Sequence, residues 1–189
     1  MQAEIQKLLH EQVESLQGLH ALNQMMDKEL DLLIQEAQRK LTDSAEKGAD
    51  HWYKESNSVK SEHHKHEARH EAKTIKHNLI KTIHTKLHGQ VSLEGVHPEH
   101  NLERLQAKLK HHLRGERRRL HKEITDRHKQ IAAHHKRLSK EEAEIYTPII
   151  QKTKELHDHI QNKTLSPEKI EQELQQLPSQ LFTPFMKFS

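Results

Sequence analysis

Apolar side chains recur at three- and four-residue steps over most of this 189-residue chain, and this spacing limits the fold more than any other feature. Only 32% of the residues are hydrophobic and 31% are charged, which leaves too little apolar filling for a compact globule of this length. Five Gly and five Pro are few for a disordered chain. The sequence therefore predicts an all-α protein in which each long helix buries one narrow stripe.

The apolar spacing and the glycines predict the first two helices. A first helix is expected over residues 3–46, with Gly48 as its stop signal. A second is expected over residues 51–88, where Gly89 ends the pattern. We expect the polar stretch 56–67 to be the least secure part of the second helix.

Prolines and a serine predict the remaining helices. A third helix is expected over residues 98–146 and a fourth over 149–163, because Pro148 should end or kink the pattern. Ser166, followed by a proline, is typical of a helix start, and Pro178 should close this short last helix.

These elements predict an elongated antiparallel helical bundle or coiled coil of three long helices, with one or two short C-terminal helices. Residues 1–163 should form the long-helix bundle, and residues 164–189 a short helix with a Phe-rich tail. Narrow stripes need cover from neighbouring helices, within the chain or from a second copy, so a homodimer is one expectation.

Charge is distributed unevenly along the chain. The net charge is −5 over residues 1–50 and +9 over residues 101–140, although the whole chain carries only +3. The acidic first helix and the basic third helix are therefore expected to pack together. Exposed ion pairs add only ~0–1 kcal/mol each, so their main effect would be on partner choice and register.

The strongest basic cluster lies in the third predicted helix and is a candidate site for an anionic partner. The phosphates that it would bind could belong to nucleic acid or to an anionic membrane, and both partners remain open at this stage. The region has no helix-turn-helix or zinc-finger signature and no aromatic residues for base stacking. A solvated face paired with the acidic first helix explains the cluster equally simply. The candidate residues are Arg114, Arg117, Arg118, Arg119, Lys122 and Arg127.

Twenty histidines are several times the usual number, and some recur at heptad spacing. His121, His128 and His135 lie beside the apolar stripe, where a neutral imidazole is tolerated and a charged one is costly. They are candidate pH sensors, and acidification is predicted to loosen the packing around the third helix. Most other histidines are expected to be solvated surface residues.

Metal binding is a weaker hypothesis from the same composition. His66 with His70, and His84 with His88, are i, i+4 pairs that can place two imidazoles on one ion. Two ligands on an exposed helix make a weak site, the chain has no Cys, and no HExxH motif occurs. No firm metal site is predicted.

The C-terminal tail holds every phenylalanine of the protein. Phe182, Phe185 and Phe188 concentrate bulky apolar surface there, and burying each one is worth ~1.5–3 kcal/mol. They either fold back to close the end of the bundle or form a docking segment for another protein.

Enzymatic motifs are missing from the sequence. GxGxxG, P-loop, GxSxG and HExxH patterns do not occur, and long helices offer few concave pockets. We expect no catalysis, no cofactor and no small-molecule substrate. The N-terminal residues lack the pattern of a secretory signal, so a cytoplasmic location is expected, with export by another route left open.

Two compositional features resemble proteins of bacterial secretion systems. The Leu/Glu/Gln pattern of residues 5–41 resembles export chaperones and coiled-coil effectors. The His/Asn/Gln/Lys-rich composition, with Glu168, Glu171 and Glu173 before a short apolar C-terminus, is similar to effectors sent through type IV secretion. The resemblance implies a helical interaction protein and assigns no residue a role.

The sequence as a whole predicts a helical scaffold or adaptor that binds another protein through its helix faces or its tail. The alternative is a basic helical module that binds an anionic membrane or nucleic acid.

Overall fold

The computed structural model describes the backbone of residues 2–54, 58–87, 89–99 and 101–188, and the side chains of 2–45, 69–87, 89–99 and 101–181. Within these ranges the chain is all-α and contains no β-strand, so the predicted fold class is confirmed. The chain divides into two compact units. The terminal unit contains residues 1–24 and 115–189, and the middle unit contains residues 25–114. The predicted division, after residue 163, separates the chain at a different point.

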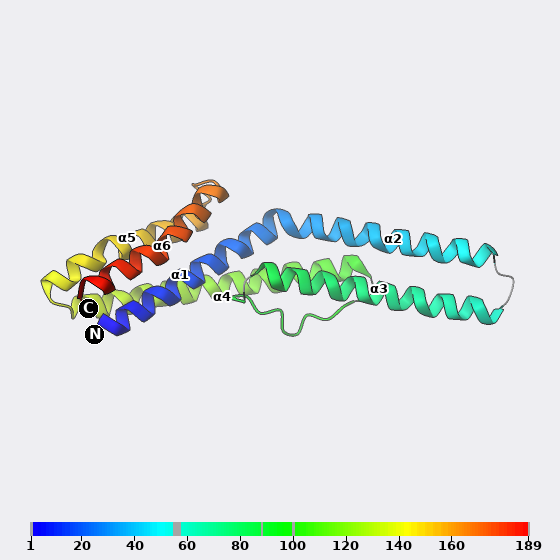
Figure 1. Ribbon diagram of the computed structural model, residues 1–189, viewed down its shortest axis with the longest axis horizontal. Coiled ribbons are helices and arrows are strands. Elements are labelled where there is room, and N and C mark those ends of the chain that lie inside the picture. Colours follow the sequence, from blue (N-terminus) through cyan, green and yellow to red (C-terminus); the bar gives the residue numbers. More distant parts are fainter. Residues whose placement is uncertain (1, 55–57, 88, 100, 189) are drawn as a thin grey trace. The chain divides into compact units, whose positions relative to one another are not determined.

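The terminal unit is built from helices α1 (Gln2–Gln24), α5 (Lys140–Asn162), α6 (Pro167–Phe188) and the second part of α4 (Leu102–Lys136). Helix α1 contacts both α5 and α6, and α5 also contacts α6 (Figure 1). The core of this unit consists of the apolar stripes that the spacing predicts. Its fully buried side chains include Ile5, Leu9, Leu16, Leu19, Leu120, Ile124, Ile131, Tyr146, Leu156 and Leu177.

Two buried glutamines of α1 link that helix to its neighbours. The amide of Gln6 donates a 3.1 Å hydrogen bond to the hydroxyl of Tyr146 on α5. The amide of Gln12 donates a 2.9 Å hydrogen bond to the backbone carbonyl of Ile124 on α4. Because a buried polar group must keep its partner, these bonds favour one register of α1 against α4 and α5.

The middle unit contains a π-helical turn η1 (Met25–Glu29), α2 (Leu30–Lys54), α3 (Ser58–Lys86) and the first part of α4. Helices α2 and α3 lie side by side (Figure 1). The carboxylate of Asp31 on α2 lies 3.8 Å from the amine of Lys110 and accepts a 3.1 Å hydrogen bond from Gln106, both on α4. The side chains buried in this unit include Leu79, Ile83, Leu87, Val91, Leu93, Leu102, Leu105, Leu109 and Leu113.

The predicted break at Gly48 is wrong. Helix α2 continues through Gly48 to Lys54, and the next helix begins at Ser58 rather than residue 51. A glycine inside a helix costs only about 1 kcal/mol relative to alanine, and it ends a helix most effectively with a positive φ angle. Gly89 has that conformation, with φ at 77°, and it follows the end of α3 as predicted.

The predicted continuous helix over residues 98–146 is also wrong, because the chain forms a helical hairpin there. Helix α4 ends at Lys136 and α5 begins at Lys140. The hydroxyl of Ser139 caps α5 by accepting a hydrogen bond of 3.3 Å from the backbone N–H of Glu142. Serine followed three positions later by glutamate is a known N-cap pattern, and it marks the start of a new helix although the apolar spacing continues.

Prolines do not end the last two helices, contrary to the prediction. Pro148 lies inside α5, and Pro178 lies inside α6, which continues to Phe188. Each proline removes one backbone hydrogen bond, but buried apolar side chains on both sides hold the helix in place. These neighbours are Tyr146 and Ile149 in α5, and Leu177 and Leu181 in α6.

The Ser139 cap makes a testable contribution to the hairpin. Ser139→Ala is expected to lower the free energy of unfolding by about 1 kcal/mol, because the first turn of α5 loses a hydrogen-bond acceptor. Urea denaturation followed by circular dichroism measures the change. Thr125→Ala, at an exposed α4 position, serves as the control and is expected to change stability by less than about 0.5 kcal/mol. Equal stability of Ser139→Ala and the native chain would contradict the role of the cap.

Candidate functional site

Arg127 of helix α4 points into the terminal unit and binds side chains of α1. The Arg127 guanidinium donates hydrogen bonds of 2.9 Å to the side-chain oxygens of Gln12 and Ser15 on α1. It also lies 3.7 Å from the carboxylate of Glu11, and only 16% of its side chain is exposed. Arg127 therefore joins α4 to α1 and is not available to an outside anion, although the sequence placed it in the anion-binding cluster.

Two further arginines of that cluster are also engaged within the unit. Arg119 forms ion pairs with Glu116 and Glu123 on its own helix. Arg117 is half-buried, and its charge acts on the ring of His121. Arg114 is exposed but belongs to the middle unit. Of the six predicted anion-binding residues, only Arg118 and Lys122 are exposed cations of the terminal unit without an ion pair in the described structure.

Arg118 and Lys122 belong to a longer row of cations, which we call the basic face and which also includes Lys129 and Lys136. At 100° per residue the four positions fall within a sector of about 40°, and they extend over roughly 27 Å of helix. All four side chains are exposed. In the described part of the chain none of them forms an ion pair. Between positions 118 and 136 no other residue falls in this sector, so the row contains no acidic residue.

Large apolar side chains do not accompany the basic face. Among side chains that the structure describes, the only large hydrophobic residue that is strongly exposed is Leu32, at 54%, and it lies on α2. Helix α4 has no Phe, Tyr or Trp. Binding at the basic face would therefore depend on charge and hydrogen bonding, without an apolar or stacking contribution from α4.

The α4–α5 hairpin also brings three histidines together. His121 Nδ1 lies 3.0 Å from His157 Nε2, and their ring centroids are 5.2 Å apart. The ring of His128 lies 5.6 Å from that of His157. His135, the third predicted pH sensor, is not part of this cluster, because its Nε2 lies 2.8 Å from the carbonyl oxygen of Ala143 near the hairpin turn.

Burial is the main influence on the protonation of this histidine cluster. It lowers the pKa of His128 to about 4; the charges of His157 and Lys154 add to the effect, and Asp158 opposes it. Burial likewise lowers the pKa of His121 and of His157. Both ring nitrogens of His128 are buried and have no hydrogen-bond partner in the described structure. The cluster therefore favours neutral imidazoles at neutral pH.

His157 is a partner of His121 and His128 that the apolar spacing does not predict. A continuous helix over residues 98–146 would place His157 far from His121. The Ser139 cap was the signal for a reversal, and a hairpin centred near residue 138 brings His157 back to His121.

The metal hypothesis gains no support from the described residues. His70 and His84 are exposed on α3, while the side chains of their proposed partners, His66 and His88, lie outside the described residues. In the side-chain ranges given above, no three His, Cys, Asp or Glu residues gather closely enough to hold a metal ion.

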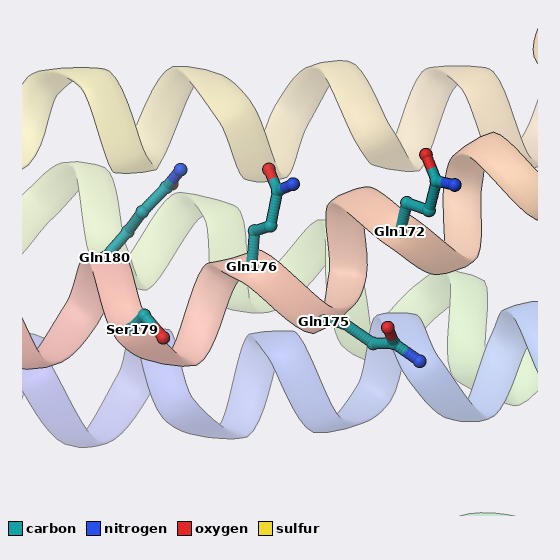
Figure 2. Close-up of a pocket in the computed structure, with 5 residues that line it drawn as sticks. All are labelled: Gln172, Gln175, Gln176, Ser179 and Gln180. Carbon is teal, nitrogen blue, oxygen red and sulfur yellow. The ribbon is translucent and has the colours of Figure 1, made fainter.

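Helix α6 contributes a polar surface and the C-terminal tail. The surface is a shallow hollow lined by uncharged side chains (Figure 2). Gln172, Gln176 and Gln180 project from one side of α6, and Gln175 projects from another. The backbone at Phe182, Phe185 and Phe188 continues α6, but their side chains lie outside the described residues, so the docking prediction for the tail is not tested.

No helix in the described ranges contains an apolar stretch that could cross a membrane. Comparisons with models of known protein families, with curated proteins and with solved structures found no match. The function proposed below therefore rests on the geometry and charge of this chain alone.

Proposed function

We propose that this protein is a non-enzymatic helical scaffold that binds an acidic protein partner along the basic face of α4. The observation that supports it is the arrangement of four exposed cations in one narrow sector with no acidic residue among them. Arg127 holds the same helix against α1 from its other side. The basic face is thus presented on a supported helix, which reduces the entropy lost when a partner binds.

An acidic helix or extended acidic segment fits this surface better than nucleic acid or membrane. The row is straight and about 27 Å long, which matches an acidic helix of similar length lying alongside it. Stacking on exposed bases relies mainly on Phe, Tyr and Trp side chains, and α4 has none of these. Membrane-surface helices usually insert large apolar side chains next to their cations, and the basic face lacks them.

The expected interaction is fast and sensitive to salt. Exposed ion pairs contribute only ~0–1 kcal/mol each, and salt screens them over about 10 Å at 0.1 M. Charge complementarity of this kind contributes more to association rate and specificity than to affinity. A cytosolic setting is part of the proposal, since a chain without Cys has no need of an oxidising compartment.

A binding experiment on the full chain tests the basic face. The probe is a labelled helical peptide that carries Glu at the spacing of Arg118, Lys122, Lys129 and Lys136. Fluorescence anisotropy measures its binding. The variant Arg118→Glu/Lys122→Glu/Lys129→Glu is expected to bind at least about tenfold more weakly at low salt, equivalent to 1.4 kcal/mol.

The control carries the same change in net charge at a different place. Lys73, Lys81 and Lys86 are exposed on α3 in the middle unit, and Lys73→Glu/Lys81→Glu/Lys86→Glu is expected to keep affinity within about threefold. Equal loss in both variants would mean that the probe responds to net charge only, which contradicts the proposal. Stronger binding to duplex DNA or to anionic phospholipid vesicles at the same salt would show that the proposed partner class is wrong.

A further inference from the structure

The histidine cluster of the α4–α5 hairpin is a group of partly or fully buried titratable side chains that the proposed function does not use. We infer that His121, His128 and His157 form a pH-sensitive latch, which holds α4 against α5 while the rings are neutral and releases the hairpin in mildly acidic solution. The inference does not depend on the proposed partner, since it concerns contacts within the terminal unit.

The geometry of the His121–His157 contact requires an unprotonated nitrogen. At 3.0 Å, Nδ1 of His121 and Nε2 of His157 can share one proton, with one nitrogen donating and the other accepting. If both rings become imidazolium, two N–H groups and two positive charges face each other. The attractive contact then becomes a repulsive one.

The position of His128 adds a second cost of protonation. Both of its ring nitrogens are buried, and within the described residues neither has a hydrogen-bond partner. A charge on this ring would lose its hydration without gaining a compensating acceptor. Protonation of His128 is therefore easier after the hairpin has opened and water has reached the ring.

Most of the charged groups of the hairpin that act on the rings are cations, which disfavour protonation. Arg117 acts on His121 from α4, and Arg127 and Lys154 act on His128 from α4 and α5. All three are cations. Asp158 on α5 is the one carboxylate that acts on His128 and His157, and its effect is smaller than that of burial.

The carboxylates of the other two helices in the unit act elsewhere. On α1, Glu11 lies against Arg127, and Glu4 lies 3.2 Å from Nδ1 of His134. On α6, Glu171 and Glu168 act on His20, whose pKa is nevertheless lowered by burial. No described group of α1 or α6 offsets the charge that acid would place on the cluster.

The direction of the pH dependence follows from the lowered folded-state pKa. Unfolded histidine has a pKa near 6.5, so the unfolded chain binds more protons than the folded one as pH falls below that value. The stabilising contribution is present above about pH 6.5 and is lost as pH falls toward 4. For His128 alone, the unfolding equilibrium constant should rise about 30-fold between pH 7.5 and pH 5.

Urea unfolding of the full chain at pH 7.5 and pH 5.0 tests the latch. The native chain is expected to show at least the 30-fold change, while His121→Gln/His128→Gln/His157→Gln loses most of it. The matched control is His70→Gln/His77→Gln/His84→Gln, at exposed positions of α3, which should respond to pH as the native chain does. The inference is overturned if the stability of the native chain does not depend on pH. It is also overturned if the stability of the cluster variant falls as much as that of the native chain between pH 7.5 and pH 5.0.

A distance measurement covers the case in which the cluster variant does not fold. The chain has no Cys, so Thr125→Cys on α4 and Gln151→Cys on α5, both exposed, accept spin labels at defined places. The interspin distance is expected to lengthen and broaden between pH 7.5 and pH 5.0. An unchanged distance distribution overturns the latch, whatever the stability of the histidine variants.

Discussion

Replacing Tyr146 with alanine is expected to lower the free energy of unfolding by about 3–5 kcal/mol, the usual range for truncating a fully buried aromatic side chain. Tyr146 has no exposed surface, and its hydroxyl accepts the hydrogen bond from Gln6. The truncation leaves a cavity between α1 and α5 and removes the acceptor of a buried amide. Urea denaturation followed by circular dichroism measures the loss.

A conservative change at the same position separates the two effects. Tyr146→Phe keeps the ring and removes only the hydroxyl, so a loss of about 1 kcal/mol is expected. The Gln6 amide also lies 3.4 Å from the backbone carbonyl of Leu181, which limits the penalty in this variant. A loss below about 1 kcal/mol in Tyr146→Ala would contradict the central place of this side chain in the terminal unit.

Arg127→Ala is expected to lower the free energy of unfolding by about 2–4 kcal/mol, because two polar side chains of α1 lose a charged donor. Gln12 is fully buried and Ser15 is nearly so, and water therefore cannot easily replace the lost hydrogen-bond donor. The same denaturation measurement applies at neutral pH.

Arg118→Ala is the matched control, since it removes the same side chain from the same helix at an exposed position. Its stability should stay within about 0.5 kcal/mol of the native chain. Comparable losses in the two variants would mean that Arg118 also supports the fold, and the basic face would then not be free for a partner. A large loss at Arg127 alone separates the structural cation from the binding cations.

The sequence predicted the helical class and the buried stripes well, because apolar periodicity depends only on local spacing. Leu9, Leu16 and Ile124 are buried where that spacing places them. The hairpin was missed for the same reason. The stripe continues with a similar period on both sides of Ser139, so only the cap distinguished a reversal from a straight rod.

The candidate site was predicted only in part, since composition cannot show which cations face inward. Arg127 and Arg118 are both arginines of the same basic stretch, and the sequence gives no sign that they differ in role. Only the hydrogen bonds of Arg127 to side chains of α1 reveal that it is structural. Lys129 and Lys136 were not predicted, because they lie apart from the run of arginines at residues 117–119. The signal for them was a regular step of seven residues, from Lys122 to Lys129 and from Lys129 to Lys136.

The most direct test of the account is to find where an acidic helix contacts this protein. Carbodiimide crosslinking joins carboxylates to lysine amines that lie in contact, and mass spectrometry identifies the lysines in the full chain. With the Glu peptide probe, we predict crosslinks to Lys122, Lys129 and Lys136 that disappear as salt rises. Crosslinks concentrated instead on α3 lysines such as Lys73 and Lys81 would contradict the basic face as the binding surface.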